Sequence, residues 1–151
     1  MKDITIDYAL RATWQAVARM YNEEAKRFDS TMAVGFTLLS IDPKTGTPST
    51  ALGPKMGMEA TSLSRILKNM EQKGLIERKP NPEDGRGVLI HLTDFGLVKR
   101  ADSKAVVLRF NETVREAVTQ SQLEGFFAVV KKINQLISEK KIYKKEQESN
   151  S

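Results

Sequence analysis

Cysteine is absent from this 151-residue chain, and histidine occurs once. The absence of thiols excludes disulfides, thiolate metal sites and thiol-based redox sensing, and it is compatible with a reducing compartment. The single histidine, His91, stands among strand-like residues, and we interpret it as a strand or surface residue rather than a general base. The sequence also has no glycine-rich phosphate loop and no cluster of metal ligands. We therefore expect no enzyme, no metal site and no cofactor.

Long apolar runs are missing as well. No segment approaches membrane-spanning length, and no apolar stretch follows a basic N-terminus as it would in a signal peptide. We therefore expect a cytoplasmic location and no membrane partner. The composition that remains, 40% hydrophobic and 28% charged residues, is typical of one soluble globular domain. A formal net charge of +5 suits a polyanion such as DNA or RNA, although many basic proteins bind neither.

Hydrophobic periodicity predicts three helices in the first part of the chain. Apolar residues recur at helical spacing over 6–28 and, after a run of N-capping residues, over 32–41. A turn-rich break follows, and then a short helix that Ser49 or Thr50 caps and Gly57 ends. Apolar side chains occupy much of the circumference of the first helix. We therefore expect the rest of its own chain to cover one side of this helix and a second subunit to cover another side.

A fourth helix and a hairpin follow. The clearest helical pattern in the chain covers 59–73, with Gly74 as its stop. Strands are predicted over 75–79 and 88–92. The polar, turn-forming residues 80–87 between them indicate a β-hairpin with a long tip.

Two more helices are predicted beyond the hairpin. Thr93 can cap the first, which is expected to end near Thr119. Residues 121–124, Ser-Gln-Leu-Glu, match a capping box that opens the last helix. Because three helices followed by a hairpin is the order of a winged helix, we predict a mainly α fold with a small β-hairpin wing. In this winged helix-turn-helix, long N- and C-terminal helices flank the core.

The helix predicted over 59–73 has two chemically different faces. At about 100° per residue, its apolar side chains fall within one arc of about 100°. They are Leu63, Ile66, Leu67 and Met70. The opposite face and its borders carry cations, hydroxyls and amides but no acid, from Thr61, Ser62, Ser64, Arg65, Lys68, Asn69 and Gln72. A helix in the major groove of DNA needs these donors and acceptors. Any surface helix has a polar face, so the adjoining short helix and hairpin are what favour DNA binding.

The hairpin tip carries its own candidates. Arg86 suits a narrow minor groove of strong negative potential, and Asp84 can pair with it and fix its direction. The alternative is a solvated turn with incidental charges. At the base of the hairpin, Arg78 and Lys79 are either phosphate contacts or ordinary edge-strand charges.

These same segments resemble the MarR family of regulators. The run from Ser62 to Arg78 is similar to that family's recognition helix and first wing strand. Residues 81–86 resemble its wing tip, and 88–96 resemble the returning strand and the start of the next helix. Each run alone is a weak signal, whereas their combination is specific.

The resemblance implies a bacterial transcription regulator, expected to be a repressor, that binds a pseudo-palindromic double-stranded operator as a homodimer. It also implies control by a small aromatic or acidic ligand. By carry-over, the groove and phosphate contacts are Ser62, Ser64, Arg65 and Lys68, and the wing pair is Asp84 and Arg86. The first and last helices would interlock in the dimer through Leu10, Trp14, Val17, Phe127, Val130, Ile133, Leu136 and Ile137.

The expected organisation is one intertwined domain with four parts. Residues 1–30 form the N-terminal dimerisation helix, and 31–93 form the DNA-binding lobe. Residues 94–138 complete the dimerisation region, and 139–151 form a charged tail.

The sequence departs from the family pattern at a few positions. Asn81 replaces a frequent acid, Gly85 replaces a usual second wing arginine, and Pro54 lies inside the third helix. The cysteine of the peroxide-sensing branch is missing. A winged helix used only for protein contacts remains the alternative, and the acid-free face of the fourth helix argues against it.

Overall fold

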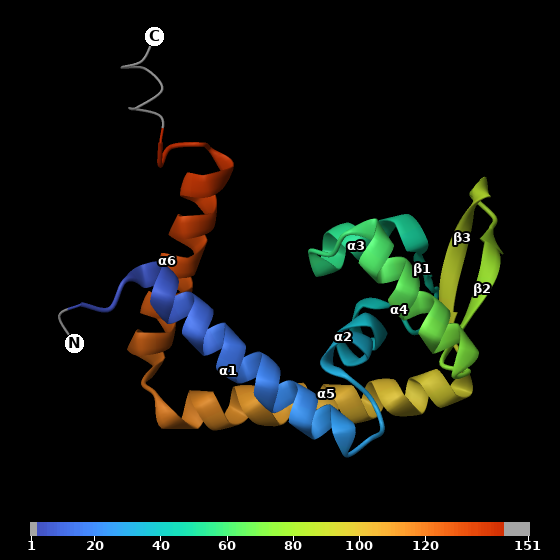
Figure 1. The fold of residues 1–151 in the computed structure, drawn as a ribbon, viewed down its shortest axis with the longest axis horizontal. Coiled ribbons are helices and arrows are strands. Elements are labelled where there is room, and N and C mark those ends of the chain that lie inside the picture. The colour runs from blue at the N-terminus through green and yellow to red at the C-terminus, as the bar shows by residue number, and fades with distance from the viewer. Residues whose placement is uncertain (1–2, 144–151) are drawn as a thin grey trace, which may run out of the picture. The chain divides into compact units, whose positions relative to one another are not determined.

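The computed structural model describes residues 3–143, apart from the side chains of residues 84 and 86. The chain divides into two compact units, residues 1–108 and 109–151, which we call the first and second units. The six helices and two strands predicted from the sequence are all present in the expected order, and the structure adds one short strand, β1 (Figure 1). The observed elements are α1 (Ile6–Lys26), α2 (Met32–Ser40), β1 (Thr47–Pro48), α3 (Ser49–Met56), α4 (Ala60–Gln72), β2 (Ile76–Asn81), β3 (Asp84–Leu92), α5 (Asp94–Ala117) and α6 (Gln120–Ser138).

Several helix ends follow the predicted capping residues. The Thr31 hydroxyl accepts a hydrogen bond from the Val34 N–H at 3.2 Å and caps α2. The prediction was wrong for α3, because Ser49 is already helical and Pro48 occupies the N-cap without a side-chain hydrogen bond. Proline is tolerated there because its fixed φ suits a helix start and the first turn needs no N–H donor. Gly57 ends α3 with φ of 65°, as expected.

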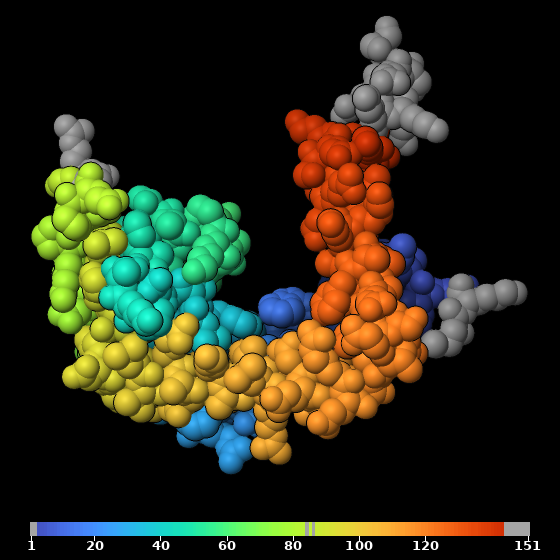
Figure 2. All heavy atoms as spheres, turned by 180° about the vertical axis from the view of Figure 1, so that it is seen from behind, coloured from blue at the N-terminus to red at the C-terminus, as the bar shows by residue number. Residues whose placement is uncertain are grey.

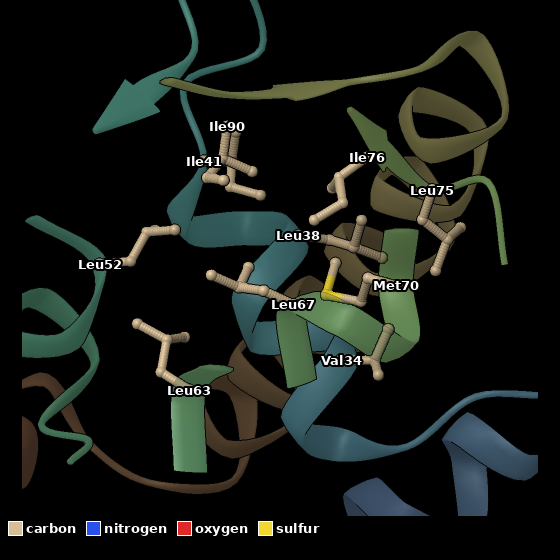
Figure 3. Packing of buried hydrophobic residues seen from close by; sticks show 10 residues of the cluster. All are labelled: Val34, Leu38, Ile41, Leu52, Leu63, Leu67, Met70, Leu75, Ile76 and Ile90. Atoms are coloured by element: carbon tan, nitrogen blue, oxygen red, sulfur yellow. The ribbon is translucent and has the colours of Figure 1, made fainter. Parts of the chain in front are cut away.

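The hydrophobic core lies in the first unit, where α2, α3, α4 and the sheet meet (Figure 3). Leucine, isoleucine, valine and methionine fill it without aromatic rings. The fully or nearly buried members are Val34, Leu38, Ile41, Leu52, Leu63, Leu67, Met70, Leu75, Ile76 and Ile90. Burying one such side chain contributes about 1.5–3 kcal/mol, so this cluster is the main support of the lobe.

The sheet has three strands in the order β1-β3-β2, with antiparallel pairing throughout. The sequence interpretation missed β1, a two-residue strand that aligns Thr47 with Ile90. It also placed the loop at 80–87, whereas β2 continues to Asn81 and β3 begins at Asp84. Pro80 is accommodated because β2 is an edge strand, where a missing N–H is tolerated, and a register shift follows it.

Figure 2 shows the first unit from behind, where the yellow start of α5 lies along the blue-green α2 region. The two helices approach closely, since a Cβ added to Gly35 would lie 3.2 Å from Ser103 Oγ. Thr93 caps α5 as predicted, with its hydroxyl accepting from the Gly96 N–H at 3.0 Å. The first unit therefore includes the start of α5 as well as the winged helix.

In the second unit, the capping box that opens α6 differs from the predicted one. Thr119, not Ser121, is the N-cap, and Gln122 is its partner. Gln122 N–H donates to the Thr119 hydroxyl at 3.1 Å, and Thr119 N–H donates to the Gln122 side chain at 2.9 Å. Both pairs fit the same four-residue pattern, so the sequence alone could not choose between them. Across residues 3–143, no helix is long and apolar enough to span a membrane.

Candidate nucleic-acid interface

Helix α4 has the two faces that its sequence predicted. Its apolar side carries Leu63, Leu67 and Met70 into the core, where their exposed fractions are 4%, 3% and 0%. Ile66, the fourth apolar residue, is half-buried against the same cluster. The seven predicted contact residues all lie exposed on the other side: Thr61, Ser62, Ser64, Arg65, Lys68, Asn69 and Gln72. The buried side thus holds the polar side rigidly toward solvent.

The two ends of α4 are defined by backbone geometry. After α3 ends, the Met58 N–H donates to the Gly53 carbonyl at 2.9 Å, and α4 begins two residues later. At the other end, Gly74 adopts φ of 75° and the Leu75 N–H donates to the Met70 carbonyl at 2.9 Å. This arrangement is a Schellman motif, which satisfies the last carbonyls of the helix. The short α3, the tight turn and α4 form a helix-turn-helix.

Helix α3 keeps its place despite the proline inside it. Pro54 is exposed and lies in the helix without ending it. The Lys55 ammonium donates to the Ser40 carbonyl at the end of α2, at 2.8 Å. This bond satisfies a carbonyl that has no partner within α2 and joins α2 to α3.

The charges at the base of the wing have different surroundings. The Arg78 Nε lies 3.3 Å from the Glu71 carboxylate of α4. The structure therefore pairs Arg78 with Glu71, whereas the sequence left it as a phosphate contact or an edge charge. Lys79 is exposed, and no ion pair is found for it within the described residues. Glu71, the only acid in α4, is thus paired beside the polar face.

The wing tip is a short turn between β2 and β3. The Glu83 N–H donates to the Asn81 side chain at 3.0 Å, which stabilises the turn. The predicted pair of Asp84 and Arg86 lies outside the described side chains, so their pairing stays a prediction. Their backbone belongs to β3, the strand that returns from the tip.

The predicted dimerisation residues leave much apolar surface uncovered in each unit. On α1, Leu10 and Trp14 are 43% and 53% exposed, and on α6, Phe127 and Ile137 are 51% and 58% exposed. The other predicted members are half-buried: Val17, Val130, Ile133 and Leu136. The sequence interpretation overlooked further exposed apolar residues of α1 and α6, namely Tyr8, Phe126 and Val129. Their place on helices already identified as apolar was the available signal.

The structure also forms a hollow within the first unit for which the sequence had no motif. Residues from α1, α2, α5 and the α1–α2 connection line it, including Tyr21, Phe28, Met32, Phe36, Lys99, Asp102 and Ser103. The Tyr21 and Phe36 rings meet edge to face, with centroids 5.6 Å apart, and burial raises the pKa of Tyr21. The Lys99 ammonium donates to the Phe28 carbonyl at 3.0 Å. The lining of this hollow forms only when the chain folds, because its residues are distant in sequence.

The apolar side of α4 is buried, a short helix and a tight turn precede it, and a β-hairpin follows it. This combination defines a winged helix-turn-helix protein. The family model that matches the chain is that of the MarR family, over residues 31–88. Over these residues the chain is similar to the MarR family of winged-helix transcriptional regulators. The matched residues cover the lobe from α2 to β3, which contains α4.

The chain is also similar to individual regulators, both in sequence and in fold. The chain is 36% identical over 78 residues to the multiple antibiotic resistance protein MarR of Escherichia coli, covering 52% of this chain and 54% of that protein. The aligned sequence thus spans about half of this relative. Among solved structures, a cysteine-to-serine mutant of E. coli MarR complexed with operator DNA has a TM-score of 0.75. That match has 26% identity and covers 85% of this chain and 92% of the other. The S. aureus MepR–DNA complex has a TM-score of 0.81 and 21% identity, and covers 88% and 98% of the two chains.

Proposed function

We propose that this protein binds double-stranded operator DNA as a homodimer and regulates transcription, with α4 as the recognition helix. The observation that carries the proposal is the exposed polar face of α4 opposite an apolar side that packs into the core. MarR and MepR, whose folds resemble this one, were solved with DNA. Those complexes favour the DNA-binding interpretation over a winged helix used only for protein contacts.

In this proposal some polar residues of α4 contact base edges and others contact phosphates. Arg65 can bind guanine in bidentate fashion, and Asn69 and Gln72 can read adenine. Lys68 and the serine and threonine hydroxyls near the helix start can contact phosphates or bases. Arg86 of the wing reaches a neighbouring minor groove or phosphate strand.

The homodimer is supported by the apolar side chains that α1 and α6 leave exposed. Large aromatic and aliphatic residues at such exposure mark interaction surfaces in soluble proteins. A two-fold dimer would place two copies of α4 in successive major grooves of a pseudo-palindromic site.

The hollow of the first unit supports the expected small-molecule control. Its aromatic and aliphatic wall, together with Lys99 and Asp102, has the mixed character of a ligand site. The PcaV regulator from Streptomyces coelicolor, a structure of the same fold, was solved in complex with its natural ligand. In our proposal the protein is a repressor whose DNA binding is relieved when a small aromatic or acidic ligand occupies this hollow.

The proposal is tested by measuring binding to a labelled random duplex by fluorescence anisotropy at two salt concentrations. Phosphate contacts release counterions, so the logarithm of the association constant is expected to fall linearly with the logarithm of salt. Selection of bound fragments from genomic DNA would then identify the operator. Failure to bind any duplex, or binding that is insensitive to salt, would favour the protein-contact alternative.

A further inference from the structure

Thr93 lies between β3 and α5, and it contacts the segment through which the chain leaves α4. Its hydroxyl donates to the Gly74 carbonyl at 2.6 Å, and its backbone N–H donates to the Leu75 carbonyl at 3.1 Å. The same hydroxyl accepts from the Gly96 N–H at 3.0 Å and caps α5. One threonine therefore satisfies polar groups at the end of one helix and at the start of another.

Gly96 brings the backbones of these two segments into contact. A Cβ at this position would lie 2.0 Å from the Leu75 carbonyl oxygen. Because that oxygen belongs to the backbone, it cannot move aside as the tip of a flexible side chain could. The absence of a side chain at Gly96 thus allows α5 to start directly against the exit of α4.

The exit of α4 is also fixed from the inside. Leu75 is buried in the core, and its N–H donates to the carbonyl of Met70, which belongs to the buried side of α4. The exit of α4, directly after its last turn, is therefore held both by the core, through Leu75, and by Thr93, through hydrogen bonds to Gly74 and Leu75. Asn69 and Gln72, two of the residues proposed to read bases, lie on this turn.

We infer that Thr93 is a positioning residue for DNA reading, which sets the place of the last turn of α4 through its hydroxyl. The inference rests on the proposed role of α4 as the recognition helix. Hydrogen bonds to base edges weaken steeply when distance or angle departs from the ideal. Phosphate contacts are more tolerant and carry no sequence information. Loss of the hydroxyl should therefore reduce specificity more than it reduces general affinity for DNA.

Three variants at this position separate the two hydrogen bonds. Thr93→Val keeps the shape of the side chain and removes both bonds, whereas Thr93→Ser retains the hydroxyl. Thr93→Asp keeps a good N-cap for α5 but has no proton to donate to the Gly74 carbonyl. The matched control is Thr119→Val, which removes the N-cap hydroxyl of α6 in the second unit.

Affinity is measured by anisotropy for a selected operator fragment and for a random duplex at the same salt, with dimer content and thermal midpoint recorded for each variant. We expect Thr93→Val and Thr93→Asp to lower the ratio of operator to random affinity about five- to tenfold, with random binding changed less than about twofold. Thr93→Ser and Thr119→Val should keep the wild-type ratio.

The ratio of operator affinity to random-duplex affinity distinguishes a positioning role of Thr93 from a merely structural one. An equal loss on both duplexes would indicate partial unfolding and would overturn the inference, as would an unchanged ratio. If Thr93→Val does not fold, the affinity ratio of Thr93→Asp tests the inference, because the aspartate still caps the N-terminus of α5. Failure of the wild-type protein to bind any duplex would instead overturn the proposed function itself.

Discussion

At the scale of single residues, the cations of the candidate interface differ in what surrounds them. Arg65 and Lys68 lie on the exposed face of α4, and neither forms an ion pair within the part of the chain that the structure describes. Arg78 is paired with Glu71, so its charge is already partly compensated. Of these three cations, we therefore assign DNA contacts to Arg65 and Lys68 and none to Arg78.

Arg65→Ala should weaken operator binding by about 1–3 kcal/mol, since one bidentate base contact is lost. Binding to random duplex should change much less. Titration of both duplexes by anisotropy measures the difference. The control is Arg27→Ala, which removes an exposed arginine whose partner is Glu24 of the preceding helix. Wild-type operator affinity in the Arg65 variant would remove this residue from the interface.

Arg86→Ala should weaken binding to operator and random duplex alike, because a minor-groove or phosphate contact at the wing carries little base information. The slope of log affinity against log salt should become shallower by about 0.9. Glu83→Gln, a change at the adjacent turn that removes no cation, serves as the control. A loss confined to the operator would assign Arg86 a base-reading role instead.

At the scale of elements, α4 is defined by its neighbours as much as by its own residues. Its N-cap, Glu59, makes no side-chain capping bond, and its start is set by the turn after α3. Its end is set by Gly74 and by the buried Leu75. Helices gain most of their stability from packing of their apolar face, and α4 follows this rule.

Gly74→Ala should destabilise the fold by about 1 kcal/mol or more, because φ of 75° is costly for a residue with a Cβ. Urea denaturation followed by circular dichroism measures the free energy of unfolding. Gly85→Ala is the matched control, since a Cβ there meets nothing within 4 Å and Gly85 has no positive φ. Equal stability of the two variants would show that the helix end is not held in this conformation.

At the scale of the whole molecule, the two units differ in how well they cover their apolar residues. The first unit has a hydrophobic core with a cluster of ten buried side chains. In the described part of the second unit, no residue of α6 is buried, although the helix carries Phe126, Phe127 and Ile137. An apolar helix without cover requires a partner surface, and a second copy of the chain is the partner that we propose.

Trp14→Glu should shift the protein from dimer toward monomer, because a carboxylate would be placed in the proposed apolar interface. Sedimentation velocity at several concentrations measures the change, and operator affinity should fall with it. Thr45→Glu, an equal charge added to an exposed loop, should leave the dimer intact. A dimer of unchanged strength in the Trp14 variant would place the interface elsewhere.

Much of the fold could be predicted from the sequence because its signals are local. The two faces of α4 follow from a period of 3.6 residues, and the glycine stops at Gly57 and Gly74 follow from backbone sterics. The exposed contact residues of α4 were predicted for the same reason. Where two local solutions were equally good, as for the capping boxes at Thr119 and Ser121, local reasoning chose wrongly.

Other features were decided only by tertiary structure, because they join residues that are far apart in the chain. Strand β1 exists by pairing Thr47 with Ile90, and two residues have no periodicity of their own. The Glu71–Arg78 pair, the hollow lined by α1, α2 and α5, and the contact of Thr93 with Gly74 arise in the same way. Sequence patterns determined which helix presents polar groups to a partner, and long-range packing determined how that helix is held.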